Sequence, residues 1–329
     1  MIKRYLIAFV IVIGVSFATS RCAAQGKNAE INTLVQAYTD LDLFNGSVLV
    51  AKQGRIILEK GYGKTAFPNG KFITPDTRFC IASLNKQFTA VLIMQLYEAG
   101  KLDLHKPVST YLSWFRKDVA EQITIHQLLS HTAGLPEYTE RTDFFTTVSK
   151  SKYTHREFIE KFCSEDLQSK PGTAYRYTNT GYYILGTIIE ELTGQSYKEV
   201  LQRQILDKIG MKSTGMASSN TGVESVPGYD YQLGAYIPVP HIELYSTIFA
   251  AGGMYSTVQD LYLWDRALYT NQLMKETSKQ ILFTPVLAGY AYGFGVAGKF
   301  IFHQGAINGF RTIITRVTDE QEVIILLSN

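Results

Sequence analysis

The sequence contains few cysteines, no strong excess of either charge and only one long hydrophobic run. Its 329 residues include three cysteines, Cys22, Cys80 and Cys163, which lie far apart along the chain. This spacing predicts no disulfide framework, and we expect Cys80 and Cys163 to be small buried hydrophobic side chains. The 32 basic and 29 acidic residues give a formal net charge of +3 without a basic cluster. Nothing in that balance favours a nucleic-acid partner.

The histidines also lack a metal-binding pattern. None of the six histidines belongs to an H-E-x-x-H motif, which would place two of them on one face of a helix. We therefore expect neither a metal nor another cofactor, and chemistry that is carried by side chains alone.

The one long hydrophobic run lies at the N-terminus. Lys3 and Arg4 precede about 14 mostly apolar residues, YLIAFVIVIGVSFA, which small residues follow. That order is typical of a secretory signal, and the run is short for a membrane span of about 20 residues. We expect residues 1–24 to be a signal peptide or a retained membrane anchor, and the protein to be exported to the periplasm or the extracellular space. Arg21 directly before Cys22 argues against lipidation of that cysteine.

Hydrophobic periodicity predicts strands at both ends of the chain and helices in the middle. Two β-branched runs, GSVLVAKQG (46–54) and RIILEKGYG (55–63), join at Gln53-Gly54 as a hairpin, and further strand patterns occupy residues 290–329. The stretch from about residue 103 to 245 is rich in helical patterns and loops. We therefore predict an α+β fold for residues 25–329, with one antiparallel sheet from both chain ends, flanked by helices, and a mostly helical lobe inserted between them.

Within the segment CIASLNKQFTAVLIMQLYEAG, Ser83 and Lys86 stand three positions apart at the start of an apolar helical pattern. Positions i and i+3 lie on one face of a helix, so the two side chains point the same way. A serine at a helix start gains from the free N–H groups and the helix dipole when its oxygen becomes anionic. A lysine can take the serine's proton if burial lowers its pKa, and the apolar residues around Lys86 predict such burial.

The S-x-x-K spacing alone is a weak signal, because serine is a common helix cap and a lysine in the first turn is often solvated. A second copy, Ser149 to Lys152, lies in the polar stretch TVSKSKYTHRE. It has neither a strand before it nor an apolar helix after it, so we interpret it as a surface loop. An α/β-hydrolase nucleophile would need G-x-S-x-G, and the residues around Ser83 contain no such glycines.

A second segment, YRYTNTGYYILG, supplies Tyr177 and Asn179 next to a buried helical pattern. On an extended chain, residues two apart face the same side. The tyrosine hydroxyl could relay a proton between the serine, Lys86 and a leaving group, and the asparagine amide could bind Lys86 and a substrate carbonyl. The similar letters YTN at 269–271 end a predicted surface helix, where we expect them to act as a cap.

A third segment, KFIFHQGAINGF, places His303, Gly305 and Ala306 on a strand pattern. Glycine in a strand lets another molecule approach the backbone closely, so an extended substrate could pair along this edge. The N–H of Ala306 could join that of Ser83 as an oxyanion hole, whose donors can each change a rate by about 10²–10³-fold. By itself, a lone histidine on a strand is more often structural.

Together the three segments resemble the serine β-lactamase and penicillin-binding-protein superfamily, and most of all its class C β-lactamase-related branch. That branch pairs S-x-x-K with Y-x-N and places K-T-G or H-x-G on a strand. The matching stretches here are Ser83 to Lys86, Tyr177 to Asn179 and His303 to Gly305, in that order. Further blocks similar to those of the family, such as ITIHQLLSHTAGLPEY, extend the resemblance over roughly residues 30–329.

The resemblance implies that Ser83 is the nucleophile, and that Lys86 and Tyr177 are its base and proton shuttle. It implies that Asn179 orients the substrate amide, and that His303 and Gly305 belong to the strand that binds substrate. Ala306 would supply an N–H of the oxyanion hole. His131, in the block LLSHTAGL, also matches, and we expect it to hold its loop without taking part in the chemistry.

Two features depart from the family pattern. His303 replaces a lysine that in true β-lactamases gives a fixed positive charge for the substrate carboxylate, and an unperturbed histidine is mostly neutral at pH 7. This favours an esterase, a D-amino-acid peptidase or a carboxypeptidase-like activity over efficient antibiotic hydrolysis. The sequence also stops at EVIILLSN, before the strand and C-terminal helix that family members usually place on the sheet. Either the sequence is truncated, or something else covers that face of the sheet, because an uncovered apolar face or edge would favour association.

We therefore expect an exported serine hydrolase that acts through an acyl-Ser83 intermediate. Its substrate would be a small molecule or a peptide: a D-amino-acid or cell-wall peptide, an ester or a β-lactam-like compound. The alternative is a penicillin-binding-like module that is acylated but turns over poorly, and serves as a cell-wall sensor or scaffold. Substrate choice should depend on loops such as residues 218–245, whose tyrosines we expect to line part of the cleft.

Overall fold

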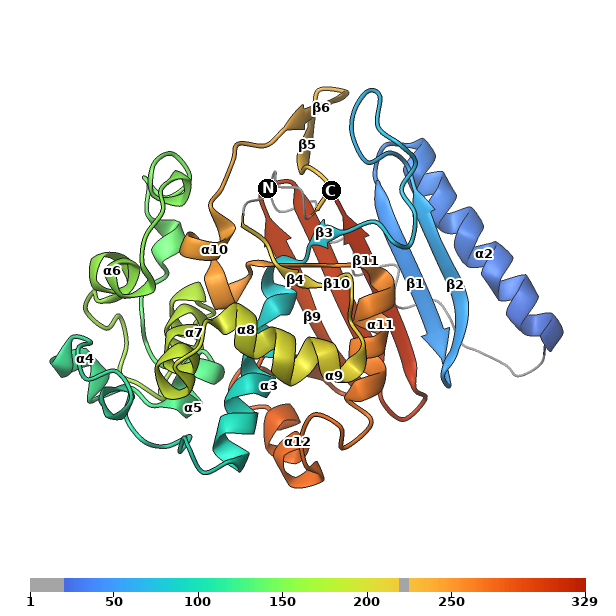
Figure 1. Cartoon of the computed structure of the whole chain (residues 1–329). Coiled ribbons are helices and arrows are strands. Elements are labelled where there is room, and N and C mark those ends of the chain that lie inside the picture. Colours follow the sequence, from blue (N-terminus) through green and yellow to red (C-terminus); the bar gives the residue numbers. More distant parts are fainter. Residues whose placement is uncertain (1–20, 219–224) are drawn as a thin grey trace.

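The two ends of the chain meet in one sheet (Figure 1). The structure, a computed structural model, describes residues 21–218 and 225–329. Its strands are β1 (Gly46–Lys52), β2 (Arg55–Tyr62), β3 (Phe79–Cys80), β4 (Gly215–Met216), β5 (Tyr229–Gln232), β6 (Ala235–Pro238), β7 (Met254–Ser256), β8 (Gly295–Ala297), β9 (Phe300–Ile307), β10 (Phe310–Val317) and β11 (Glu322–Ser328). Its helices are α2 (Arg21–Asp40), α3 (Asn85–Glu98), α4 (Lys117–Ala120), α5 (Ile125–Leu129), α6 (His155–Phe158), α7 (Asn179–Thr193), α8 (Tyr197–Leu201), α9 (Asp207–Ile209), α10 (Leu244–Thr247), α11 (Val258–Ala267) and α12 (Glu276–Phe283).

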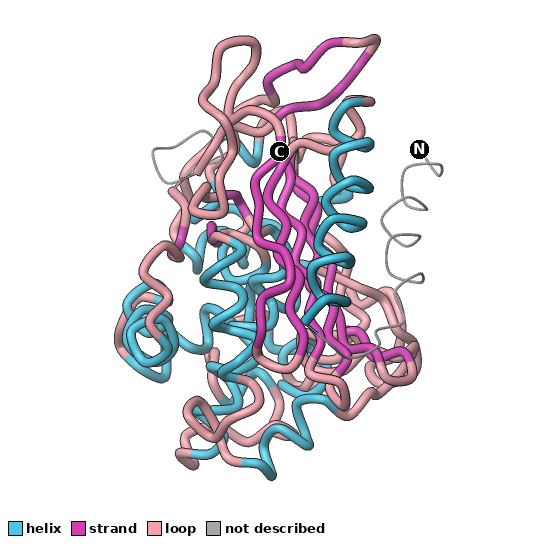
Figure 2. The backbone as a smooth tube through the Cα atoms, turned by 90° about the vertical axis from the view of Figure 1, so that its right-hand side faces the viewer, coloured by secondary structure: helices cyan, strands magenta, loops and turns pink. Residues whose placement is uncertain are grey.

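Six strands form the main antiparallel sheet, in the spatial order β2-β1-β11-β10-β9-β8. The early strand β1 pairs with the last strand β11, with Gly46 opposite Ser328 and Lys52 opposite Glu322. Most helices come between these strands in the sequence and gather on one side of the sheet (Figure 2). The predicted α+β fold, with its sheet built from both chain ends and its inserted helical lobe, is therefore confirmed.

Two predicted chain turns, at Gln53-Gly54 and at Gly194, are present in the structure. Gln53 and Gly54, with φ of 51° and 73°, make the two-residue hairpin between β1 and β2. Gly194 closes α7 in the left-handed conformation at φ 65°. The predicted leader, residues 1–24, lies almost entirely outside the described residues.

Alternation along the strands divides the sheet into two apolar faces. The inner face packs against α11 and shares one large core with α3 and α7, which includes Leu49, Val323, Ile325 and Leu327. The outer face forms a smaller cluster with α2, in which Val48 and Val50 of β1 meet Val35. Burial on both faces fixes the register of β1 and β11, because a shift of one residue would exchange the two sets of side chains.

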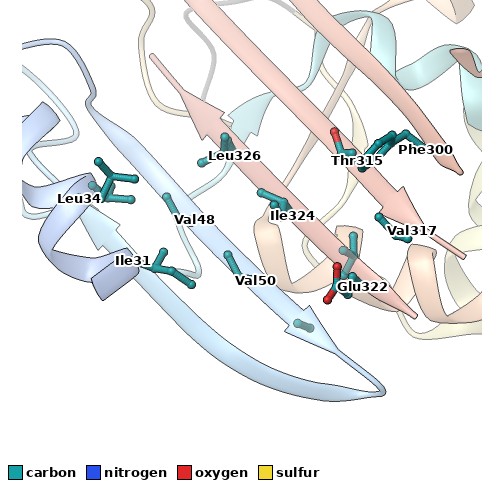
Figure 3. A pocket seen from close by; sticks show the side chains of 13 residues that line it. Ile31, Leu34, Val48, Val50, Phe300, Thr315, Val317, Glu322, Ile324 and Leu326 are labelled. Atoms are coloured by element: carbon teal, nitrogen blue, oxygen red, sulfur yellow. The ribbon is translucent and has the colours of Figure 1, made fainter. Parts of the chain in front are cut away.

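An apolar groove crosses the outer face beside α2. In Figure 3, Ile31 and Leu34 of α2 lie near Val48 and Val50 of β1, with Ile324 and Leu326 of β11 beyond them. The groove continues over Phe300, Thr315 and Val317. The turn that carries Ser83 packs on the inner face of β9 and β10, so the groove is not part of the candidate site.

Three local expectations differ from the structure. The strand pattern at residue 290 becomes a strand only at Gly295, because residues 290–294 turn toward the helices. Ser149 is fully buried within a 3₁₀ turn, Val148–Lys150, and does not lie on a surface loop. Among the tyrosines of residues 218–245, those of the β5–β6 hairpin contact Asp42 and Phe67.

Candidate active site

The candidate nucleophile lies on a tight turn that precedes a helix. Ser83 occupies a 3₁₀ turn, Ala82–Leu84, which continues directly into α3. Ala82 has a left-handed φ of 48°, a strained conformation for a residue with a Cβ and one that is common at functional sites. Thr312 of β10 holds the turn by donating from Oγ1 to the carbonyl oxygen of Ile81 at 2.9 Å. The predicted helix start is thus refined, since α3 begins two residues after Ser83.

Lys86 is fully buried, and its amine has three acceptors around it. Nζ lies 3.1 Å from Ser83 Oγ, 2.7 Å from Asn179 Oδ1 and 2.8 Å from the carbonyl oxygen of Ala251. An amide oxygen and a backbone carbonyl can only accept hydrogen bonds, whereas a hydroxyl can also donate. A neutral amine therefore gives its two N–H groups to Asn179 and Ala251, and turns its lone pair toward the hydroxyl of Ser83.

The protonation states of the two predicted proton acceptors differ. Burial lowers the pKa of Lys86 to about 7, although the negative charge of Glu137 opposes that shift. A substantial fraction of the lysine is therefore neutral at pH 7. Burial raises the pKa of Tyr177 well above its usual value, so its phenol stays protonated. Lys86 can begin a reaction as the base, and Tyr177 can only relay a proton.

Tyr177 and Asn179 approach the amine from the start of α7. The chain is extended at Thr178, the N-cap, and becomes helical at Asn179. The ring centroid of Tyr177 lies 4.8 Å from Lys86 Nζ, and its hydroxyl faces that of Ser83. The structure thus brings the S-x-x-K and Y-x-N residues together.

Glu137 is a member of this cluster that the sequence motifs did not predict. It follows Pro136 in the loop after α5, where it caps the 3₁₀ turn Tyr138–Glu140, and only 9% of its surface is exposed. Its Oε1 accepts from Asn179 Nδ2 at 3.1 Å, and its Oε2 accepts from the backbone N–H of Asn179. The only signal in the sequence is one acidic residue within the otherwise uncharged block HTAGLPEY.

His303 is buried, and the protein occupies both of its ring nitrogens. Nδ1 lies 2.7 Å from the carbonyl oxygen of Gln304, so Nδ1 carries the hydrogen. Nε2 then accepts from the Tyr290 hydroxyl at 2.9 Å. Burial, together with the nearby Lys86, lowers the pKa of His303 to about 3. The imidazole is therefore neutral near pH 7 and provides no free N–H for a substrate carboxylate.

Gly305 is required by a close contact within the protein. A Cβ on this residue would lie 2.4 Å from the carbonyl oxygen of Ile81 and 2.3 Å from Thr312 Oγ1. The missing side chain admits the Ser83 turn to the strand, whereas the sequence interpretation assigned that space to a substrate. The approach of a substrate to the strand at Gly305 stays a prediction.

Ala306 lies on a part of β9 that has a free edge in the described structure. β8 pairs only with residues 300–302 of β9, so it does not reach Ala306. On the other side, Ile307 and Phe310 close a two-residue hairpin, and Ala306 is opposite Arg311. Hydrogen-bonded and non-bonded pairs alternate from such a closing pair, which directs the N–H of Ala306 to the free edge. Its role as an oxyanion-hole donor stays a prediction.

His131 supports the segment that leads to Tyr177. Its Nδ1 accepts from the N–H of Thr178 at 3.2 Å, and its carbonyl oxygen accepts from the N–H of Arg176. Burial lowers its pKa well below the usual value. These contacts match the loop-holding role that the sequence predicts.

Comparison with known proteins places this arrangement in a family. The sequence model of the Beta-lactamase family matches residues 31–329. The chain belongs to this family. The predicted resemblance to β-lactamases and penicillin-binding proteins is thereby confirmed.

Three relatives illustrate the range of this Beta-lactamase family member's neighbours. It is similar to penicillin-binding protein 4* of Bacillus subtilis (strain 168), with 29% identity over 334 residues that cover 93% of this chain and 72% of that protein. It is similar to the octameric penicillin-binding protein homologue from Pyrococcus abyssi, with a TM-score of 0.77, 26% identity and coverage of 92% and 73%. A D-amino acid amidase from Ochrobactrum anthropi SV3 shares the fold, with a TM-score of 0.75, 24% identity and 91% coverage of each chain.

The described residues contain neither a membrane-spanning helix nor a cluster of metal ligands. No helix among residues 21–218 and 225–329 is both long and apolar enough to cross a membrane. Within the same residues, no three His, Cys, Asp or Glu side chains gather as metal ligands would. Export and the lack of a cofactor remain predictions.

Proposed function

We propose that this protein is an exported serine hydrolase that cleaves an ester or an amide through an acyl-Ser83 intermediate. The observation that carries the proposal is the position of Lys86 Nζ, 3.1 Å from Ser83 Oγ with two other acceptors holding its N–H groups. Such an amine is a base already aimed at the hydroxyl proton.

The acylation step uses the residues around this pair. Ser83 Oγ attacks the substrate carbonyl carbon, and its proton passes to Lys86 Nζ. The N–H groups of Ser83 and Ala306 stabilise the oxyanion of the tetrahedral intermediate. When the intermediate collapses, the bond to the leaving oxygen or nitrogen breaks, and that atom takes a proton from Tyr177. Lys86 returns its proton to Tyr177, and attack by water on the acyl-serine then releases the acid.

The neutral His303 favours substrates without a carboxylate near the scissile bond. Its N–H is already bonded to Gln304 O, and its other nitrogen is occupied by Tyr290. A penicillin would bring its carboxylate to a strand without the fixed cation of a true β-lactamase. Esters and amides of D-amino acids meet no such requirement, and the free edge of β9 offers backbone groups to an extended acyl chain.

The location follows from the N-terminal sequence. Residues 1–24 have the order of a secretory signal or an anchor, and we propose that they carry the hydrolase to the periplasm or beyond the cell. A cell-wall peptide is then an accessible substrate.

The second candidate is a penicillin-binding-like module that is acylated but turns over slowly. Its support is that Lys86 lies against Ser83, Tyr177 and Asn179, whereas no side chain is assigned to activate the deacylating water. The module would act as a cell-wall sensor or scaffold.

Stopped-flow measurement of product release separates the two candidates. The substrates are a chromogenic short-chain ester, a D-amino-acid anilide and a chromogenic cephalosporin. We expect steady turnover of the ester or the anilide that Ser83→Ala abolishes. A burst of one equivalent without steady turnover would favour the slow module, and equal steady rates in the parent and Ser83→Ala would contradict both.

A further inference from the structure

The carboxylate of Glu137 is held as an acceptor by four donors. Oε1 accepts from the N–H and Oγ1 of Thr139 at 2.9 Å and 2.7 Å, and from Asn179 Nδ2 at 3.1 Å. Oε2 accepts from the backbone N–H of Asn179. An ionised carboxylate can only accept hydrogen bonds. A protonated carboxyl group would carry an O–H hydrogen that points toward one of these donors. The geometry therefore suits a negative charge in a site that is almost closed to solvent.

This carboxylate determines how the Asn179 amide is turned. An asparagine side chain has an accepting end and a donating end of nearly the same shape. With Nδ2 bound to Glu137, Oδ1 faces Lys86 Nζ at 2.7 Å. The flipped amide would set Oδ1 against a carboxylate and Nδ2 against an amine, so Glu137 excludes it.

The groups that face Lys86 include one carboxylate and several neutral rings. Glu137 and His131 lie in the loop after α5, His303 lies on β9, and Tyr177 and Tyr182 lie at the start of α7. Burial lowers the pKa values of the two histidines and raises those of the two tyrosines, so all four are uncharged near pH 7. Glu137 opposes the fall in the pKa of Lys86.

The groups that face Glu137 itself are also neutral apart from Lys86. They are Tyr138, Cys163 and Tyr177, whose pKa values burial raises. The negative charge of Glu137 is therefore paired with the lysine through one amide, in surroundings of low polarity where charges interact strongly.

We propose that Glu137 is a positioning residue of the reaction: it fixes the Asn179 amide with Oδ1 toward Lys86, and it sets the protonation of that lysine by placing a negative charge behind the amide. The inference rests on the proposed function and adds a residue that influences the protonation of the base, Lys86. Glu137 touches neither Ser83 nor the reacting atoms, so it acts through Asn179.

The test is the pH dependence of the reaction of Ser83 with a fluorophosphonate, followed by intact mass for the parent, Glu137→Gln and Glu137→Asp. Glu140→Gln is the matched control, since Glu140 lies in the next turn, is exposed and pairs with Arg176. Removal of a charge that raises the pKa of Lys86 moves the acid limb of the profile to lower pH. We expect a shift of about one pH unit for Glu137→Gln, with a lower plateau because the Asn179 amide is no longer fixed.

Glu137→Asp keeps the negative charge but shortens the side chain. The acid limb of its pH profile should therefore stay within about 0.3 pH unit of the parent's, while its maximal labelling rate falls. Glu140→Gln should match the parent in the position of the acid limb and in the maximal labelling rate. An unshifted limb in Glu137→Gln, whatever its plateau, would overturn the inference. If that variant does not fold, a limb in Glu137→Asp displaced by as much as one unit would overturn it instead. If Ser83→Ala were still labelled by the fluorophosphonate, the proposed function would be overturned. That result differs from labelling that depends on Ser83 but has an unshifted acid limb in Glu137→Gln, which would overturn only the inference about Glu137.

Discussion

Gly305 of β9 lies against Ile81, so that a Cβ at residue 305 would sit 2.4 Å from the carbonyl oxygen of Ile81. The contact joins the strand to the residue before the strained Ala82, and so to the turn that presents Ser83. The position of the nucleophile therefore depends on the absence of a side chain on a neighbouring strand.

Gly305→Ala should displace the turn and slow the reaction of Ser83. Overpacking of this kind lowers the free energy of unfolding by about 1–3 kcal/mol, which denaturant unfolding would measure. We also expect labelling by a fluorophosphonate to slow at least about tenfold, because a small misplacement of a nucleophile strongly reduces its reaction rate. Gly26→Ala is the control, because Gly26 is exposed in α2 and a Cβ there meets nothing within 4 Å. Unchanged stability and labelling in Gly305→Ala would contradict the account of this contact.

The rate of acylation should follow the ionisation of Lys86. The neutral amine is the active form, so kcat/KM for an ester should fall about tenfold per pH unit as the pH drops below the lysine pKa of about 7. His303, with a pKa of about 3, stays neutral over the range and adds no second limb. A pH–rate profile from 5 to 9 checks this expectation, and a rate that stays flat between pH 5 and 7 would exclude Lys86 as the base.

Tyr177→Phe should impair proton transfer while it preserves the packing around Lys86. The ring that lies 4.8 Å from Lys86 Nζ remains, and only the hydroxyl that faces Ser83 is lost. We expect acylation by an ester to slow about 10²-fold or more with little change in thermal unfolding. Tyr175→Phe, two residues earlier in the same segment, is the control. Equal rates in the two variants would mean that Tyr177 does not relay the proton.

The parts of the site that the sequence predicts depend on local spacing. Ser83 and Lys86 are three residues apart, and Tyr177 and Asn179 are two apart, so each pair is directed to one side by backbone geometry alone. The sheet is predictable for a similar reason, since alternating strands at both chain ends have few other ways to bury their apolar faces.

The rest depends on tertiary contacts that no local pattern encodes. Glu137 is one acidic residue in a loop, and its place behind Asn179 arises only when that loop packs against the start of α7. The neutral state of His303 likewise depends on Tyr290, a residue that reads as part of a strand and instead turns toward the imidazole. The reason for glycine at residue 305 is visible only once the Ser83 turn lies on β9.

The proposed function requires that Ser83, and no other serine, is the nucleophile. Intact-protein mass spectrometry after incubation with a fluorophosphonate tests it most directly, on the parent, Ser83→Ala and Ser149→Ala, the last being the serine of the second S-x-x-K. We expect a single adduct on the parent and on Ser149→Ala, and none on Ser83→Ala at equal folded content by circular dichroism. An adduct that persists in Ser83→Ala would contradict the claim.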